Sequence, residues 1–84
     1  MAFQIKVDPA VFKVIQKFPV KDILRIQVTI NSLADNPYGG DIKKLTGDNV
    51  WRRRVGSYRI FYEIRKDEQV VYIYNVERRT SKTY

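Results

Sequence analysis

The sequence lacks both cysteine and histidine, and these two absences exclude whole classes of functional site. None of its 84 residues is Cys or His. Without cysteine there is no disulfide framework and no thiolate nucleophile. Without histidine the commonest metal ligand and the commonest general base are both missing. A zinc site and a Ser/His/Asp triad are therefore excluded by composition.

Long apolar runs are also missing. No segment reaches the roughly 18 apolar residues that a membrane-spanning helix needs. The first residues, MAFQIKVD, contain no long apolar run of the kind found in a signal peptide. We therefore expect a cytoplasmic protein that does not associate with membranes.

Negative charge is scarce relative to positive charge. The chain has 16 Lys and Arg against 9 Asp and Glu, which gives a net charge of +7 and a pI near 9.9. Such a balance favours nucleic acid or an acidic protein as partner. Apolar residues make up 44% of the sequence, which indicates a packed globule and not a disordered basic tail. The length allows one small domain, residues 1–84, and no second one.

The first half of the chain predicts a strand followed by two helices. Apolar and polar residues alternate from Phe3 to Val7, as in a half-buried strand. Asp8 and Pro9 are typical of a helix start, and this short helix should end before Pro19. Apolar residues at helical spacing predict a second helix from about Val20 to Asp35. Together the two helices should form a hairpin.

The second half predicts a small antiparallel sheet. The expected strands are Ile42–Thr46, Val50–Val55, Tyr58–Ile64 and Val70–Val76, the last three forming a meander. The side chains expected to face the helices are Trp51, Val55, Tyr62, Ile64, Tyr72 and Tyr74. Arg53 falls on this apolar face, where an unpaired arginine is costly. It must reach an edge, find a carboxylate, or show that the register is different.

The segment WRRRVGSYRIFY, residues 51–62, carries the clearest functional signal. If its two strands join at Gly56 and Ser57 with Arg54 opposite Arg59, then Arg52 lies opposite Phe61. Adjacent cations repel one another, so such a cluster must be solvated or must meet an anion. The sequence therefore predicts a phosphate or RNA site, and the alternative is a charged, solvated sheet face.

The order of these elements, together with KKLTG, WRRRVGSYRIFYEI and VERRTSKTY, resembles the RelE/ParE superfamily of bacterial and archaeal toxins, and in particular its RelE branch. The resemblance covers nearly the whole chain. It implies a RelE-like α+β fold in which an N-terminal strand and a two-helix hairpin precede the antiparallel β-meander in one small sheet. It also implies the toxin of a type II toxin–antitoxin system, which cuts mRNA in the ribosomal A site without a metal or other cofactor. The implied partners are a cognate RelB-like antitoxin, the ribosome and mRNA, with DNA contacted only through the antitoxin complex.

The resemblance assigns roles to individual residues. Arg52 and Arg54 match basic residues beside the scissile phosphate, and Arg59 matches the arginine that stabilises the phosphate in the transition state. Arg79 matches a C-terminal arginine of that site, and Tyr84 matches a terminal tyrosine that orients or stacks on the substrate. Further RNA contacts are expected from Lys43, Lys44, Phe61, Arg78 and Lys82.

Departures from the family pattern bear on the mechanism. The basic pair is arginine where well-studied members have lysine, and Glu77 stands where many relatives have histidine. Arginine binds phosphate well, but its pKa above about 12 makes it a poor general base. The proton could instead pass to Tyr84, Glu77 or Glu63, or to water or the substrate. A surface ion pair with a neighbouring arginine is the simpler role for Glu63.

Two alternatives to the ribonuclease remain open. One is a ParE-like toxin that inhibits DNA gyrase by binding it, and the other is a relative that has lost its catalytic activity. All three would share one fold, so the fold does not separate them. The basic face with Arg79 and Tyr84 favours the ribonuclease, because binding gyrase does not require a phosphate-shaped arginine cluster.

Overall fold

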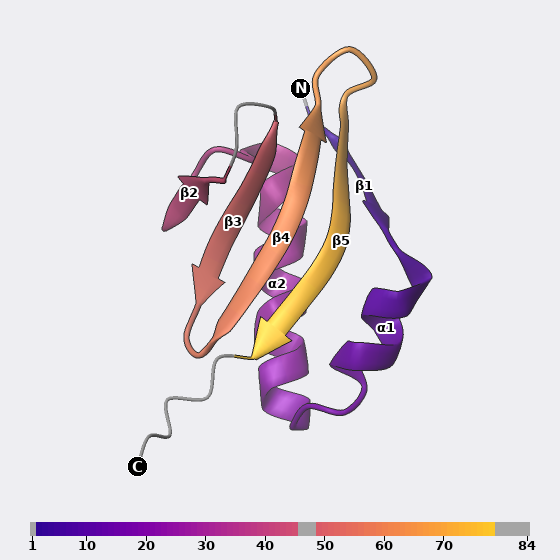
Figure 1. Ribbon diagram of the computed structural model, residues 1–84, viewed down its shortest axis with the longest axis vertical. Helices are drawn as coiled ribbons and strands as arrows, with labels where there is room; N and C mark the ends of the chain where they lie inside the picture. Colours follow the sequence, from indigo (N-terminus) through magenta and orange to yellow (C-terminus); the bar gives the residue numbers. More distant parts are fainter. Residues whose placement is uncertain (1, 46–48, 79–84) are drawn as a thin grey trace.

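The computed structural model describes residues 2–45 and 49–78 and confirms the expected α+β order (Figure 1). The elements are β1 (Gln4–Val7), α1 (Pro9–Ile15), α2 (Val20–Asp35), β2 (Ile42–Lys44), β3 (Val50–Val55), β4 (Tyr58–Arg65) and β5 (Val70–Arg78). Strand β2 is shorter than expected, and Thr46 lies outside the described residues. Strand β5 continues past Val76 to Arg78.

The sheet is mixed, with the strand order β1-β5-β4-β3-β2. Strands β2 to β5 pair antiparallel, which confirms the meander expected for β3, β4 and β5. Strand β1 pairs parallel with β5, with Ile5 opposite Val71. The first strand of the chain therefore lies beside the last. The two helices connect β1, at this edge of the sheet, to β2, at the opposite edge.

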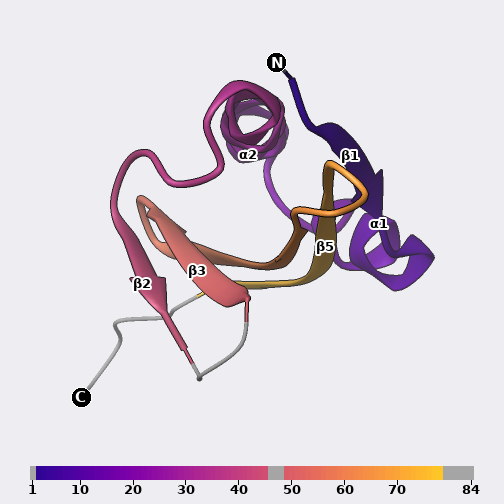
Figure 2. The ribbon, with the colours of Figure 1, turned by 90° about the horizontal axis from the view of Figure 1, so that it is seen from above.

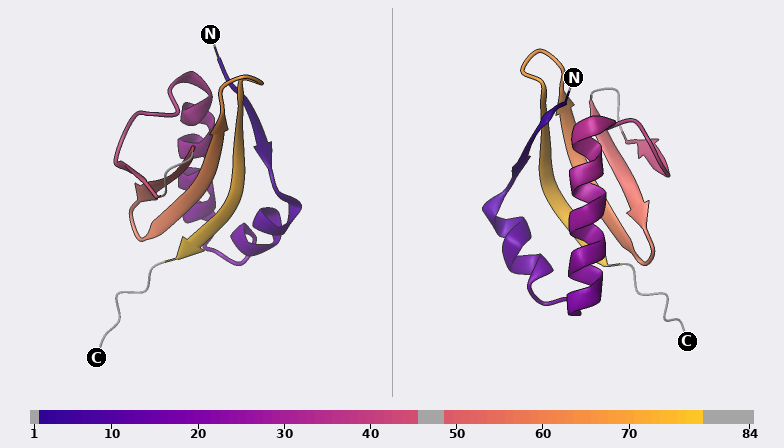
Figure 3. Two further views of the ribbon diagram at one scale, coloured as in Figure 1. Left: turned by 45° about the horizontal axis from the view of Figure 1, so that its top comes forward. Right: turned by 180° about the vertical axis from the view of Figure 1, so that it is seen from behind.

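Both helices lie on one side of the sheet. Helix α2 crosses the face that Figure 3 shows from behind, and the strands curl around it in Figure 2. Helix α1 lies beside β1 and β5. The buried core between these layers comprises Val11, Ile15, Ile26, Ile30, Leu33, Val55, Tyr58, Ile60, Tyr62, Ile64, Val71, Ile73 and Val76. In the part of the chain that the structure describes, no helix covers the other face of β3, β4 and β5. No helix among these residues is long and apolar enough to cross a membrane.

Asp8 connects the start of α1 to the sheet. Its Oδ1 accepts a hydrogen bond from the Ala10 backbone N–H at 2.9 Å, as expected for an N-cap residue before Pro9. Its Oδ2 accepts from the Tyr72 hydroxyl of β5 at 2.7 Å. The hydrogen bond from Tyr72, followed by that from Ala10, lowers the pKa of Asp8 below its ordinary value. One carboxylate thus caps a helix and joins it to β5.

Tyr72 and Tyr74 do not face the helices, so this expectation was wrong. The pairing of β4 with β5 shifts register in the middle of the strands, and Tyr74 is the extra residue of the resulting bulge. Ile73 and Val76 are both buried although they lie three residues apart, because the bulge changes which face each residue occupies. Tyr72 is instead directed toward Asp8, and Tyr74 is exposed.

Arg53 keeps the expected register and reaches the edge of the sheet. It lies opposite Ile60, and its Nη1 donates to the Gly39 carbonyl oxygen at 3.1 Å. Gly40, with a positive φ of 83°, leaves room for the guanidinium, since a Cβ there would collide with it. The loop between α2 and β2 therefore supplies the partner that the apolar face lacks.

Tyr62 also makes a hydrogen bond to the loop between α2 and β2. Its hydroxyl donates to the Pro37 carbonyl oxygen at 2.8 Å, and its side chain is fully buried. Burial raises the pKa of Tyr62 to about 12, although the nearby Arg53 charge acts in the opposite direction. The loop that precedes β2 is thus fixed by two hydrogen bonds from the sheet.

Candidate functional site

The hairpin of β3 and β4 has the register that the sequence predicts. Arg54 lies opposite Arg59, and Arg52 lies opposite Phe61. Gly56 in the connecting turn has a φ of 58°, a conformation that glycine adopts without strain. The three arginines and the aromatic ring consequently share the face of the sheet that no described helix covers.

Strands β2 and β5 extend this group into two rows across the sheet. The first row contains Arg54, Arg59 and Glu77, and the second contains Lys43, Arg52, Phe61 and Asn75. Neighbouring strands lie about 4.8 Å apart, so each row places its side chains at a spacing that one phosphate group can bridge. We call these seven residues the arginine face.

Two carboxylates, Asp41 beside the arginine face and Glu77 within it, do not neutralise its positive charge fully. Asp41 Oδ2 is 3.8 Å from Arg54 Nε, and Glu77 Oε1 is 4.0 Å from Arg59 Nη2. Both distances are too long for a hydrogen bond, and exposed ion pairs of this kind contribute little to stability. The side chains of the two carboxylates are 66% and 49% exposed, so water competes for both. An incoming anion can therefore displace them.

Two arginine donors on this face are buried without an acceptor. The Nε atoms of Arg52 and Arg59 have no hydrogen-bond partner among residues 2–45 and 49–78. A buried donor left unsatisfied costs on the order of 1–3 kcal/mol. Phosphate oxygens are good acceptors for the planar fork of arginine, because they can accept two parallel hydrogen bonds. The face is thus prepared to receive an anion with several oxygens.

Phe61 supplies an apolar surface between the cations. Its ring centroid lies 6.2 Å from that of Tyr74, the bulge residue of β5. A nucleobase can stack on such a ring while its phosphate contacts the neighbouring arginines. The arrangement therefore suits a nucleotide better than a simple inorganic anion.

Two further predicted site residues, Lys44 and Arg78, lie apart from this face. Lys44 pairs with Trp51 on the side of the helices, and its Nζ lies 5.8 Å from the indole centroid. Arg78 lies opposite the buried Tyr58, with its guanidinium 5.7 Å from that ring. The other three predicted residues, Arg79, Lys82 and Tyr84, lie outside the described residues.

Tyr58 fixes the start of β4 next to Arg59. Its hydroxyl donates to Asp22 Oδ2 of α2 at 2.7 Å, and its ring lies 4.7 Å from that of Phe18. Burial, followed by the hydrogen bond to Asp22, raises the pKa of Tyr58 above its ordinary value. The buried residue therefore anchors the strand that presents the adjacent arginine to solvent.

Asn75 and Asp41 belong to the site but were missed by the sequence analysis. Asn75 lies on the arginine face only because the bulge at Tyr74 reverses the alternation of β5, so the sequence pattern could not have placed it there. Asp41 lies in the loop before β2, and its backbone carbonyl accepts from the Arg54 N–H at 2.9 Å. No periodicity marks such a loop residue.

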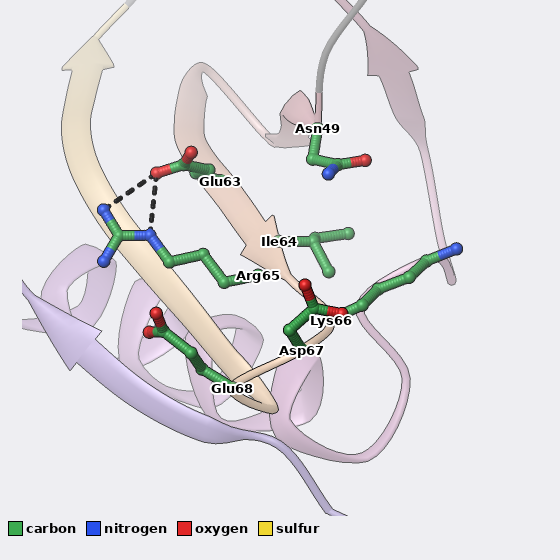
Figure 4. A pocket seen from close by; sticks show the side chains of 7 residues that line it. All are labelled: Asn49, Glu63, Ile64, Arg65, Lys66, Asp67 and Glu68. Atoms are coloured by element: carbon green, nitrogen blue, oxygen red, sulfur yellow. Dashed lines mark hydrogen bonds and ion pairs between the residues drawn. The ribbon is translucent and has the colours of Figure 1, made fainter.

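A separate hollow of about 450 Å³ lies at the turn between β4 and β5 (Figure 4). Its lining consists of Asn49, Glu63, Ile64, Arg65, Lys66, Asp67 and Glu68. Glu63 Oε1 accepts from Arg65 Nε at 3.0 Å and lies 3.0 Å from its Nη2, which confirms the expected surface ion pair. Glu63 lies about 13 Å and Arg65 about 20 Å along β4 from Arg59, so the pair does not take part in the row of Arg54, Arg59 and Glu77.

Comparison with known proteins identifies the family of the chain. Residues 12–82 match the family model described as ParE toxin of type II toxin-antitoxin system, parDE. A protein of Methanocaldococcus jannaschii with the provisional name toxin RelE1 is 30% identical over 83 residues, which cover 94% of this chain and 92% of that protein. The chain therefore belongs to the RelE/ParE superfamily and is a type II toxin of the RelE family.

Solved structures give the same result for the fold. The RelE–RelB complex of Pyrococcus horikoshii contains a chain that matches with a TM-score of 0.85 and 27% identity, covering 98% of this chain and 100% of that one. The isolated RelE toxin of E. coli matches with a TM-score of 0.82 over 96% of this chain and 88% of that one. Its identity is only 14%, so this second likeness concerns the fold alone.

Proposed function

We propose that the protein is a ribosome-dependent endoribonuclease that cleaves mRNA in the A site. The observation that carries the proposal is the arginine face, on which Arg52 and Arg59 each hold a buried Nε donor without an acceptor among the described residues. A toxin that acted only by binding a protein would gain nothing from donors arranged for phosphate. The cytoplasm, where ribosomes translate, is the proposed location.

The reaction requires the ribose 2′-hydroxyl to attack the adjacent phosphorus in line. Arg54 and Arg59, opposite each other on β3 and β4, would hold the non-bridging oxygens and neutralise the charge that develops on them. Phe61 would stack on a base, while Arg52 and Lys43 would position the backbone of the RNA. The expected products are a 2′,3′-cyclic phosphate and a 5′-hydroxyl, and no metal is needed.

The resemblance supplies the remaining roles in this proposal. Arg79 and Tyr84 would complete the site from the C-terminal segment, and Lys82 would contact the RNA there. Lys44 and Arg78 point toward the other side of the sheet, so they would contact ribosomal RNA and not the strand that is cut. This division follows from strand alternation.

We also propose a RelB-like antitoxin as the partner that holds the toxin inactive, with DNA contacted only through that complex. The matching archaeal structure is a RelE–RelB complex. In this chain, α2 exposes Val20, Leu24 and Val28, which lie four residues apart and are 72%, 57% and 68% exposed. A stripe of this kind on a chain of charge +7 suits an acidic, amphipathic segment.

Primer extension on mRNA translated in vitro tests the ribonuclease. The wild-type protein should produce cuts at the codon in the A site, and the cut ends should carry a 2′,3′-cyclic phosphate. Supercoiling by DNA gyrase should be unaffected at the same protein concentration. Inhibition of gyrase without any cleavage would identify the ParE-like alternative, and inactivity in both assays would identify a catalytically inactive relative.

The antitoxin surface has an independent test. Leu24→Glu places a charge in the centre of the exposed stripe and should weaken binding of the cognate antitoxin at least tenfold. Cleavage by the free toxin should not change, because α2 lies on the opposite side of the sheet from the arginine face. The matched control is Gln27→Glu, which adds the same charge to the same helix outside the stripe. Equal binding by Leu24→Glu and wild type would show that the antitoxin uses another surface.

A further inference from the structure

The proposed cleavage needs a group that accepts the proton of the 2′-hydroxyl, and the arginines are unsuited to this step. Three carboxylates lie on or beside the uncovered face in the described part of the chain: Asp41, Glu63 and Glu77. Glu63 is held by Arg65 at 3.0 Å at the far end of β4 (Figure 4). Asp41 lies beside Arg54, at the outer edge of the sheet. Glu77 is the carboxylate within the arginine face itself.

Glu77 lies at the end of the row formed by Arg54 and Arg59. Its Oε1 is 4.0 Å from Arg59 Nη2, and its Oε2 is 3.4 Å from Asn75 Nδ2. The side chain is 49% exposed, so RNA can approach it from solvent. A phosphate held between the two arginines would place its neighbouring ribose beside this carboxylate, because adjacent strands are about 4.8 Å apart.

The bulge of β5 is what directs Glu77 to this position. Val71 and Ile73 face the helices, and strict alternation from them would turn Asn75 and Glu77 toward the helices as well. The extra residue at Tyr74 reverses the alternation, so that Val76 is buried and Glu77 lies opposite Arg59. Bulges often redirect a side chain at a functional site in this way.

The exposed tyrosine on this face is a poor alternative. The partial burial of Tyr74 raises its pKa above the ordinary value, and the charge of Glu63 acts in the same direction. A phenol with a raised pKa is almost entirely protonated near neutral pH, so it cannot accept a proton. An ionised carboxylate, in contrast, can only accept.

We infer that Glu77 is the general base of the proposed ribonuclease, an inference that rests on the proposed function. The 2′-hydroxyl proton passes to a carboxylate oxygen of Glu77 while the 2′-oxygen bonds to phosphorus. The bond from phosphorus to the 5′-oxygen breaks, and the departing 5′-oxygen takes a proton from water. Glu77 then returns its proton to solvent. Binding of phosphate to Arg59 replaces the long ion pair, which leaves the carboxylate for the hydroxyl.

Glu77→Gln tests the inference, with Glu63→Gln as the matched control. Both variants remove one negative charge from the same face of the sheet and keep the side-chain volume. Single-turnover cleavage of mRNA on programmed ribosomes should fall at least about 100-fold for Glu77→Gln and stay within about threefold of wild type for Glu63→Gln. Ribosome binding should persist in both. Cleavage by Glu77→Gln within threefold of wild type would overturn the inference.

Chemical rescue separates the role of a base from a structural role. Glu77→Ala should regain cleavage when acetate or formate is added, whereas chloride at equal ionic strength should have no effect. The wild-type rate should rise with pH on the acid side, and this rise should be absent from Glu77→Gln. The charged group facing Glu77 from β4 is Arg59, with Arg54 beyond it on β3. Absence of cleavage by the wild type would overturn the proposed function itself, whereas failure of rescue with an active wild type would overturn only the role of Glu77.

Discussion

The two faces of the β3–β4–β5 sheet differ in how far their polar side chains find partners within the described chain. On the helix side, Tyr62 and Arg53 donate to loop carbonyl oxygens at 2.8 and 3.1 Å. On the uncovered side, Arg52 and Arg59 keep buried donors without acceptors in the described chain, and the ion pairs of Arg54 and Arg59 are 3.8 and 4.0 Å long. Tyr62 and Arg53 thus find acceptors within the protein, whereas the Nε atoms of Arg52 and Arg59 do not. Trp51 Nε1 is the exception on the helix side, because it too is buried without an acceptor in the described chain.

Because successive side chains of a strand point to opposite faces, core residues and residues of the arginine face are neighbours in the sequence. Ile60 is fully buried between Arg59 and Phe61, both of which lie on the arginine face. A substitution at one position should therefore affect activity with little effect on stability, and a substitution at the next should do the reverse. This separation can be tested residue by residue.

The largest effect is expected for Arg59→Ala. Loss of a cation aimed at the developing charge should slow cleavage by about 100- to 1000-fold. The free energy of unfolding should not fall, because the long ion pair with Glu77 contributes little and the substitution removes a buried donor that has no acceptor in the described chain. Primer extension and urea unfolding measure the two quantities. Arg65→Ala is the control, since it removes an ion-paired arginine from the other end of β4 and should leave cleavage unchanged. Full cleavage by Arg59→Ala would refute the assigned site.

Ile60→Ala should have the opposite pattern. Truncating a fully buried isoleucine leaves a cavity and should destabilise the protein by about 2–5 kcal/mol. Cleavage per folded molecule should stay close to that of wild type at a temperature where the variant is folded. Thermal unfolding combined with activity at low temperature checks both parts. A stable variant with low activity would show that the two faces are not independent.

Tyr62→Phe should alter the response of stability to alkaline pH. The raised pKa, about 12 against an ordinary 10.0, means that the folded state favours the neutral phenol. The associated stability is present below pH 10 and is lost as the pH rises through about 12, an effect of up to roughly 3 kcal/mol. Urea unfolding at pH 9 and pH 11.5 should show a smaller loss for the variant. An equal loss would mean that Tyr62 does not titrate differently in the two states.

The smallest effect is expected for Tyr58→Phe. The variant keeps the buried ring and loses the hydrogen bond to Asp22, which should cost about 1 kcal/mol of unfolding free energy. Cleavage should fall less than threefold, since the backbone of β4 remains paired on both sides. A loss of cleavage comparable with that of Arg59→Ala would show that the anchor also positions the neighbouring arginine.

The hairpin and the long helix could be predicted because their signals are local. Alternation around the Gly56 turn was enough to place Arg54 opposite Arg59, and apolar spacing was enough to bound α2. The side of the sheet on which Tyr72 and Tyr74 lie could not be predicted, because no residue type in β5 indicates the bulge. The carbonyl partner of Arg53 comes from a loop fourteen residues earlier, where periodicity carries no information.

The site was predictable to the same extent. The hairpin residues Arg52, Arg54, Arg59 and Phe61 lie where alternation placed them. Lys43 and Lys44 were named together, but adjacent strand residues face opposite ways, and only Lys43 joins the arginine face. The roles of Arg79 and Tyr84 remain predictions from the family resemblance.

The parallel pairing of β1 with β5 has a consequence for how the protein folds during its synthesis. Gln4 and Val70 are neighbours in the sheet although almost the whole chain separates them. Closing so long a loop is slow, and it cannot begin until β5 has left the ribosome that makes it. During synthesis, Arg54 and Arg59 therefore exist before Glu77 is beside them.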